Sequence, residues 1–546
     1  MRASSSSTEP LKGVSKPPAV HTAAGPNAIA GRALSRSPCR IHQARISQSS
    51  DHEAQPEELH KPMTRSTFGS TKTSPTESDM LLCSCESTDF DTMMAVMGDE
   101  RSRERLQSHS HLRRYDSMDS VGNSSDPKAR SRAKNRVIVS AVANLSTAYN
   151  LAVINYALML AQRTYPPSTP QVTSSVVSCS LIGAITGQLT FGYIGDAVGR
   201  RKGMIFTLLL TIAGALASAI LPWGNDSIYP ILAACRFVLG LGVGGVYPLS
   251  ATTAVESSHD EVKKSKIVAA VFSFQGLGQV LAPLLAYLFM RFDVDPAVAW
   301  RLLLGVGALP GLFVLREAFA TTETCTFRSG RQLDASYHSL LKALRHESLL
   351  LGKLFGASMG WFLFDITFYG NVIFTPVILE DTFGYDTNHF QDVALCSLFV
   401  AAIGLPGYFV TILAVGRINF RTIQIMGFVV MAGLFAILGF FYDELLKHAA
   451  PLLLTLYALT FFFSNFGPNV STFCLPAEIF PADVRVKLNG IAAASGKIGA
   501  TVGAAMFGMI EKDAGVTYVL VLSGVVSVLG AVVTYYFIPS KRYHHQ

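Results

Sequence analysis

Apolar residues in this chain are gathered into long segments that begin after Arg136 and recur almost to the last residue. Each segment holds about 20 residues, the length that an α-helix needs to cross a hydrocarbon core of about 30 Å. A helix satisfies its own backbone hydrogen bonds in lipid, so the pattern predicts a membrane protein with twelve transmembrane helices. The approximate cores are 137–161, 172–194, 203–221, 229–252, 267–289, 299–315, 354–379, 392–415, 422–441, 450–474, 488–510 and 516–538.

A polar stretch divides these segments into two groups of six. Equal groups around a central loop predict two repeated helical halves around one axis. We therefore expect an all-α membrane fold with two six-helix bundles. The predicted parts are a tail at 1–135, an N-terminal bundle at 136–316, a cytoplasmic loop at 317–352, a C-terminal bundle at 353–540 and a cytoplasmic tail at 541–546.

The first 135 residues are rich in Ser, Thr, Pro, Arg and His and have no sustained apolar periodicity. Such a composition does not bury enough apolar surface to offset chain entropy, so we expect a disordered N-terminal tail. Residues 1–50 are basic and Ser-rich with one acid, Glu9, which is typical of an organellar transit peptide and also of an ordinary basic tail. The run at 113–117, RRYDS, is a candidate kinase site, with chance occurrence as the alternative.

The chain is 49% hydrophobic and 15% charged, and its net charge of +7 lies in short basic clusters between apolar segments. That distribution argues against nucleic-acid binding, because clusters of this kind set the orientation of a membrane protein. They predict cytoplasmic termini; we expect the plasma membrane, with an organellar membrane as the alternative. The spans contain no nucleophile–base pair and no metal-ligand spacing, so we expect no enzyme, no cofactor and no metal site.

The link between the second and third segments reads GYIGDAVGRRK, residues 192–202. Its glycines permit a tight turn between helices, and its aspartate can pair with the arginines or with a neighbouring helix end. The run closely resembles the loop motif of the major facilitator superfamily, which stabilises one conformation of the cytoplasmic gate. The resemblance implies a gate role for Gly192, Asp196, Gly199, Arg200 and Arg201.

The corresponding link in the second half is degenerate, because Gly416 stands where the superfamily usually has an acid. Arg417 follows it. The later run PAEIFPADVR, residues 476–485, again resembles the family. We expect Glu478 and Arg485 to pair with Arg417 as a gate latch at the inner end of this half, with loop solvation as the alternative.

Two ionisable residues fall inside apolar segments. Lys497 lies about nine residues, or ~13 Å, into the eleventh segment, and Asp365 lies about eleven residues into the seventh. A charge at this depth costs at least ~2.5 kcal/mol unless a partner, a cavity or a ligand compensates it. We interpret Lys497 as a cation for an anion inside the membrane, with snorkelling or a structural ion pair as the alternative. A helix-to-helix pair is the alternative for Asp365.

Other polar side chains accompany these two charges. Trp361, Asp365 and Tyr369 are spaced by four residues and therefore share one face of a helix. Tyr247 precedes Pro248 in the fourth segment, where a proline frees backbone groups and marks a site or a bend. Amides inside the spans serve either as interhelical partners or as ligand contacts. They belong to Gln275, Asn465 and Asn469.

Several longer runs carry a more specific resemblance: RFVLGLGVGGVYPLSAT, AAVFSFQG, WFLFDITFY, LTFFFSNFGPNVSTFCLPAEIFPADVR and GIAAASGKIGA. Over roughly residues 135–540 the chain closely resembles the fungal and plant phosphate:proton symporters of the major facilitator superfamily. The resemblance implies secondary transport by alternating access, with phosphate bound between the halves. By motif position the implied phosphate ligands are Tyr247, Gln275, Trp361, Asp365, Tyr369, Asn469 and Lys497.

Departures from that family concern proton handling. The family has an aspartate where Val246 stands, and its first-span motif T-D-x-Y-D reads here as STAYN, residues 146–150, without either acid. Asp365 remains of the carboxylates that the resemblance implies for proton coupling. We hypothesise that the anion site is kept and that proton coupling is weakened or lost.

Two further functions stay open. One is a carrier of a small organophosphate, such as a glycerophosphodiester, which would need the space that Val246 opens. The other is a non-transporting phosphate sensor that signals through the N-terminal tail. The expected partners are phosphate or a small phosphorylated anion, protons, the lipid bilayer and a kinase acting on the tail.

Overall fold

The computed structural model describes residues 127–167, 169–224, 227–258, 260–324, 326–327, 349–383 and 390–540. Most of the predicted tail, the candidate kinase run at 113–117, most of the central loop and residues 541–546 lie outside this part of the chain. The first helix begins at Pro127, ahead of the predicted boundary at 136. The basic residues before the first apolar segment therefore form the opening turns of that helix.

The predicted apolar segments of the N-terminal half coincide with helices. The first five segments lie within one helix each, whereas the sixth is divided between α8 and α9, with Gly307 at the division. The helices are α3 (Pro127–Thr164), α4 (Pro170–Ala197), α5 (Arg200–Ile220), α6 (Ile228–Val255), α7 (Glu261–Arg291), α8 (Pro296–Val306) and α9 (Leu309–Ala320).

The C-terminal half follows the same plan, with an additional short helix, α15. Its helices are α12 (Leu350–Phe383), α13 (Phe390–Ala414), α14 (Phe420–Phe440), α15 (Tyr442–His448), α16 (Ala450–Ser464), the π-helical turn η1 (Asn465–Asn469), α17 (Val470–Ile479), α18 (Arg485–Ala514) and α19 (Val516–Phe537). Within the described residues, 11 helical stretches are long and apolar enough to cross a membrane. The remaining predicted segment, 354–379, lies within α12, a continuous helix of 34 residues.

The tenth predicted segment is broken in its middle. Phe466 and Gly467 leave the helical region of backbone dihedral angles, with φ −84° and ψ 48° at the first and φ −175° and ψ −126° at the second. Pro468 follows and cannot donate a backbone hydrogen bond, which is a common cause of a kink. Pro248 has no such effect, because α6 continues through it.

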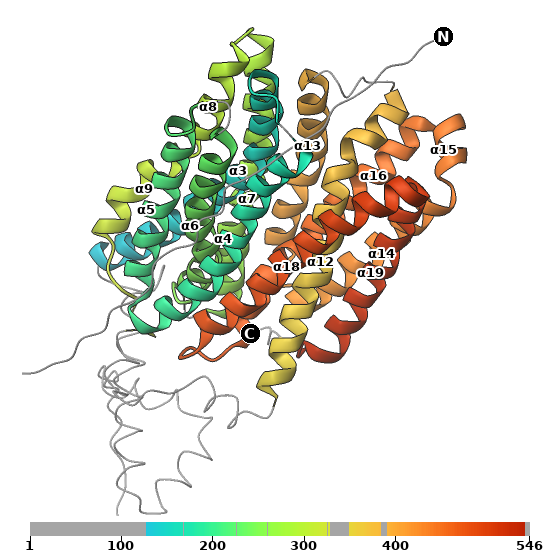
Figure 1. The fold of residues 1–546 in the computed structure, drawn as a ribbon. Helices are drawn as coiled ribbons and strands as arrows, with labels where there is room; N and C mark the ends of the chain where they lie inside the picture. The colour runs from blue at the N-terminus through green and yellow to red at the C-terminus, as the bar shows by residue number, and fades with distance from the viewer. Residues whose placement is uncertain are drawn as a thin grey trace, which may run out of the picture. The chain divides into compact units, whose positions relative to one another are not determined.

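The two halves meet along two pairs of helices, α4 with α18 and α7 with α13 (Figure 1). Small residues allow the first pair to approach closely: a Cβ atom at Gly490 of α18 would lie 3.1 Å from the Cα atom of Gly192 on α4. Gly192, predicted for the gate, therefore lies in the contact between the halves.

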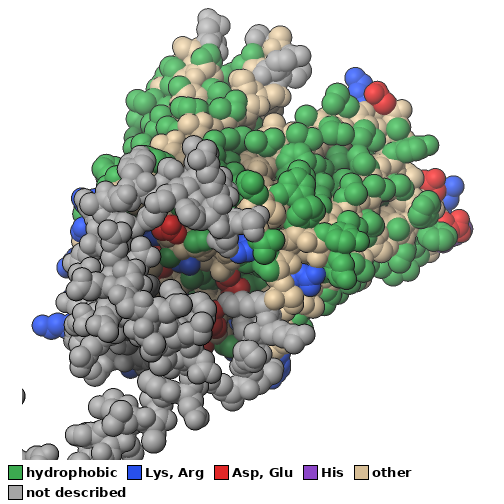
Figure 2. Space-filling model, turned by 90° about the horizontal axis from the view of Figure 1, so that it is seen from below, with side chains coloured by type: hydrophobic (Ala, Val, Ile, Leu, Met, Phe, Trp, Pro, Cys, Tyr) green, Lys and Arg blue, Asp and Glu red, His purple; other side chains and the backbone are tan. Residues whose placement is uncertain are grey.

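Large apolar side chains cover much of the outer surface of the helices (Figure 2). Phe313 of α9 is 80% exposed and Phe440 of α14 is 75% exposed. Exposed apolar area of this extent suits a hydrocarbon surrounding rather than water. The polar residues considered below are, by contrast, buried between helices.

Candidate functional site

The centre of the molecule holds a buried ion pair between α18 and α12. The Nζ atom of Lys497 lies 2.9 Å from Oδ2 of Asp365, and it donates a second hydrogen bond of 3.0 Å to the hydroxyl oxygen of Tyr369. Lys497 is 3% exposed and Asp365 is 2% exposed. Small residues beside Lys497 let α18 pack closely against α12. A Cβ atom at Gly496 would lie only 2.7 Å from the indole nitrogen of Trp361.

The N-terminal half contributes an aromatic side chain to the same place. The ring of Tyr247 stands edge-to-face against Trp361, with 6.2 Å between centroids, and Nζ of Lys497 lies 5.7 Å from the Tyr247 centroid. The hydroxyl of Tyr247 donates a 2.8 Å hydrogen bond to Oε1 of Gln275 on α7. Residues from both halves therefore meet around one ammonium group.

The kink at η1 orients the amide of Asn469. Its Nδ2 donates to Oδ1 of Asn465 at 2.7 Å and to the hydroxyl oxygen of Tyr408 at 2.9 Å. The Tyr408 hydroxyl in turn donates to Oε1 of Gln279 at 3.2 Å. This amide network joins α13 and η1 of one half to α7 of the other, and it fixes Asn469 beside the ion pair.

All seven residues predicted to bind phosphate line one small cavity, together with Phe272 and Phe368. A larger cavity adjoins it and shares Tyr247, Gln275, Phe368 and Tyr369. The larger cavity extends along α3 and α7 away from their first turns, towards Tyr156 and Pro283. Among the residues lining the two cavities, Asp365 is the one carboxylate and Lys497 the one cation.

Such a lining suits a small anion. An ammonium group, hydroxyl groups, an indole N–H and amide N–H groups are all donors, and an oxyanion offers acceptors to each of them. Asp365 competes with an incoming anion for Lys497. An anion that binds here therefore either replaces Asp365 as the negative partner of Lys497 or requires Asp365 to take up a proton.

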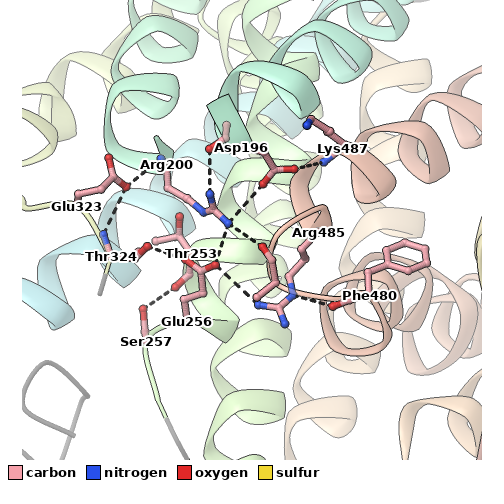
Figure 3. A network of polar contacts seen from close by, with 12 residues as sticks. Asp196, Arg200, Thr253, Glu256, Ser257, Glu323, Thr324, Phe480, Arg485 and Lys487 are labelled. Atoms are coloured by element: carbon pink, nitrogen blue, oxygen red, sulfur yellow. Dashed lines mark hydrogen bonds and ion pairs between the residues drawn. The ribbon is translucent and has the colours of Figure 1, made fainter. Parts of the chain in front are cut away.

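A second polar network lies where α4 ends and α5 begins (Figure 3). This is the end of the helix bundle away from which the larger cavity extends. Nη2 of Arg200 lies 3.4 Å from Oδ1 of Asp196 and 3.1 Å from Oε1 of Glu256. Arg485 of the other half shares this glutamate, with 3.7 Å between Nη1 and Oε1. Thr324 adds a 2.7 Å hydrogen bond to Oε2 of Glu256.

Backbone groups extend this inner network across the halves. Oδ2 of Asp196 accepts a 2.9 Å hydrogen bond from the backbone N–H of Lys487, and Nη2 of Arg200 donates to the carbonyl of Ala482 at 3.2 Å. Oε1 of Glu323 accepts from the backbone N–H groups of Arg200 and Arg201 at 2.8 and 3.1 Å. These contacts hold α4 and α5 of one half against the start of α18 in the other.

Residues 137–475 match the family model of the Major Facilitator Superfamily. The inorganic phosphate transporter PT2 of Toxoplasma gondii is 34% identical over 420 residues, covering 76% of this chain and 73% of the relative. The low affinity inorganic phosphate transporter 4 of Medicago truncatula is 32% identical over 433 residues, covering 67% and 81%. The chain belongs to the phosphate transporters of the major facilitator superfamily.

The solved structures with the same fold include the proton:xylose symporter XylE bound to 6-bromo-6-deoxy-D-glucose. Its TM-score is 0.64 at 20% identity, with 75% of this chain and 96% of that chain covered. At this identity the likeness concerns the fold. The curated relatives are named as transporters, which agrees with the expectation that this facilitator is not an enzyme.

The inner gate of this facilitator differs in part from the expectation. Arg485 pairs with Glu256 and not with Arg417, and the carboxylate of Glu478 accepts a hydrogen bond from Ser265 of α7. Arg417 is exposed in the link between α13 and α14, and no ion pair of it is found in the described part of the chain. The sequence does not reveal that Arg417 lies apart from α17, because two links at the same end of a helical bundle need not be in contact.

Several residues of these networks were not predicted from the sequence, among them two acids and one tyrosine. Glu256 and Glu323 follow the fourth and sixth segments, where an acid resembles ordinary loop solvation, and Tyr408 resembles a core aromatic residue of the eighth segment. The two acids could have been predicted, because the basic residues of the 192–202 motif at an inner helix end require counter-charges from neighbouring inner ends.

The positions that lack the family's acids are filled by uncharged groups. The Nδ2 atom of Asn150 donates at 2.9 Å to the carbonyl of Ser146 and at 2.9 Å to that of Gly307. Val246 is 1% exposed within an apolar cluster that includes Phe191 and Val486. Thr147, at the third such position, is also buried and uncharged, so none of the three offers this facilitator a carboxylate that can exchange a proton.

Proposed function

We propose that this protein carries inorganic phosphate across a membrane by alternating access, with the anion held between the two halves at Lys497. One observation carries the proposal: donors from α6, α7, α12, η1 and α18 converge on a single cavity around a buried ammonium group. The relatives named as phosphate transporters support the choice of ligand. Tyr247, Gln275, Trp361, Tyr369 and Asn469 supply neutral donors to the phosphate oxygens.

Asp365 is the residue through which a proton can act on this site. Its carboxylate neutralises Lys497 at 2.9 Å. A proton taken up by Asp365 would remove that competition and free the ammonium group for phosphate. With Asn150 and Val246 uncharged, we expect a weak response of transport to a proton gradient.

The inner network supports the alternating-access part of the proposal, because it closes one end of the molecule. The bonds of Asp196 to Lys487 and of Arg200 to Ala482 join the halves at one end, whereas the larger cavity continues from the site towards the other. Release on the inner side requires these bonds to break. The basic clusters next to α3, α5 and α7 favour a cytoplasmic location for that end and for both termini, with the plasma membrane as the expected membrane.

Uptake of radiolabelled phosphate into proteoliposomes tests the proposal. We expect uptake by the wild type, loss of uptake in Lys497→Ala, and normal uptake in Lys512→Ala, which removes an exposed lysine near the end of α18. An imposed inward proton gradient should change the wild-type rate only slightly. Equal uptake by wild type and Lys497→Ala would overturn the assignment of the site, and a steep acceleration by the gradient would overturn weak coupling.

A small organophosphate is the second candidate substrate. The larger cavity supports it, because it adjoins the cavity at Lys497 and is lined mainly by apolar side chains such as Leu151, Pro283 and Val400. A phosphate group at Lys497 would leave an organic part in that space. Competition of glycerol phosphates with labelled phosphate decides between the two: an inhibition constant well below that of unlabelled phosphate would favour the organophosphate.

A further inference from the structure

Arg236 of α6 is a fully buried cation for which the described residues supply no carboxylate. It is 0% exposed, and its Nη1 atom donates one long hydrogen bond of 3.4 Å to the backbone carbonyl of Asn150. Its Nε and Nη2 atoms have no hydrogen-bond partner among the described residues, and neither has Oδ1 of Asn150. A buried guanidinium usually lies against a carboxylate, because leaving its charge unpaired is costly.

The charges in the interior therefore do not balance. The buried charged side chains in the described part of the chain include Arg200 with its partners Asp196 and Glu256, and Arg136, Arg236, Asp365 and Lys497. Arg136 and Arg200 lie at the inner ends of α3 and α5, where Arg200 has two acidic partners. The three that remain lie within the spans, and one carboxylate stands there against two cations. Among the described residues, the buried charges within the spans therefore sum to one net positive charge.

Arg236 is close enough to the phosphate site to change its electrostatic potential, but it is not part of that site. Arg236 precedes Tyr247 by eleven residues on α6, which corresponds to about 16 Å along the helix. It does not line either cavity, although Leu151 and Ala152, which follow its partner Asn150, form part of the wall of the larger one. Two unit charges about 15 Å apart at an effective dielectric constant of about 20 alter a binding equilibrium by about sixfold.

We propose that Arg236 is a specificity residue that raises the affinity of the central cavity for an anion through its uncompensated charge, without touching the ligand. Asn150 is the second half of this arrangement, because an aspartate in its place would neutralise the guanidinium. The inference rests on the proposed phosphate site at Lys497 and adds to it a distant electrostatic determinant. It also implies that the absence of an acid at residue 150 raises the affinity of the cavity for an anion.

Two variants neutralise the same charge in different ways. Arg236→Gln removes it, and Asn150→Asp supplies its counter-charge with little change of shape. We expect each to weaken binding of radiolabelled phosphate to the purified full-length protein by about fivefold. Asn150→Ala is the matched control, since it loses the amide hydrogen bonds but leaves the charge, and we expect its Kd to stay within twofold of the wild type.

Thermal unfolding of the same samples separates charge from packing. A purely structural role predicts that Asn150→Asp, which gives Arg236 a carboxylate, raises the unfolding temperature and leaves Kd unchanged; that result would overturn the inference. Weaker binding in a variant at least as stable as the wild type supports it. Phosphate binding by the wild type with equal Kd values in all variants refutes this inference alone, whereas absence of binding by the wild type refutes the proposed function as well.

Discussion

Lys497 and Asp365 form an ion pair of 2.9 Å between α18 and α12, and both side chains are buried. The pair is a neutral unit in the middle of the membrane span, which explains how two charges are accommodated there. It also places the one carboxylate of the cavity lining on the ammonium group that an anion would need. Charge at Asp365 and anion binding at Lys497 are thereby linked.

Asp365→Asn is expected to separate these two effects. The amide keeps the shape of the carboxyl group but cannot exchange a proton or neutralise Lys497. Phosphate should therefore bind at least as tightly as to the wild type, and the remaining dependence of uptake on external pH should disappear. Uptake measured between pH 5.5 and 7.5 checks this. Asp392→Asn, outside both cavities, is the control, and a pH profile of Asp365→Asn that follows the wild type would contradict the account.

Tyr247→Phe tests the contribution of the N-terminal half to the site. The substitution removes the hydroxyl that bonds Gln275 at 2.8 Å and keeps the ring against Trp361. One lost hydrogen bond to phosphate corresponds to about 1 kcal/mol, so we expect Kd to rise about fivefold. Tyr518→Phe, at a tyrosine that is 62% exposed, should leave Kd unchanged. No change in Tyr247→Phe would remove Tyr247 from the ligand set.

Glu256→Gln addresses the inner network. Glu256 faces Arg200 and Arg485, so its neutralisation leaves two largely buried guanidinium groups with less compensation. Removal of one partner from a buried pair costs about 3–5 kcal/mol, and we expect a clearly lower unfolding temperature. Glu261→Gln breaks the exposed pair with Lys264 and should shift it little. Similar shifts in the two variants would argue against a buried network.

Gly199→Ala probes the turn that precedes α5. Gly199 has φ 123°, a conformation that side-chain-bearing residues rarely adopt, and a Cβ atom there would overlap the carboxylate of Glu323. We expect a loss of about 1–3 kcal/mol in the free energy of unfolding. Gly433→Ala lies within α14 with no atom in the way and should stabilise the protein by up to about 1 kcal/mol. Destabilisation by Gly433→Ala, or none by Gly199→Ala, would contradict this reading of the turn.

The sequence predicts the helices well because a membrane span requires a long apolar run whatever surrounds it. Lys497 and Asp365 are found for the same reason, since a charge within such a run is conspicuous. The break at Phe466 and Gly467 is not predicted, because Pro248 in α6 shows that a proline in a span need not bend it. Its position depends on the packing of Gly467 against Gly427.

The partners of the gate residues are less predictable than the residues themselves. The 192–202 motif identifies Arg200 and its near partner Asp196, but two further acids around Arg200 come from positions 56 and 123 residues away in sequence. Arg417 and Arg485 are alike in sequence terms, both being arginines near inner helix ends. Only the arrangement of α6 next to α18 selects Arg485 as the partner of Glu256.

A structure of the purified protein determined with phosphate tests the central claim most directly. The account predicts an anion in the cavity between Tyr247, Asn469 and Lys497, with the distance from Lys497 Nζ to Asp365 Oδ2 longer than the present 2.9 Å. Phosphate bound elsewhere, with the Lys497–Asp365 pair intact and the cavity empty, would contradict it.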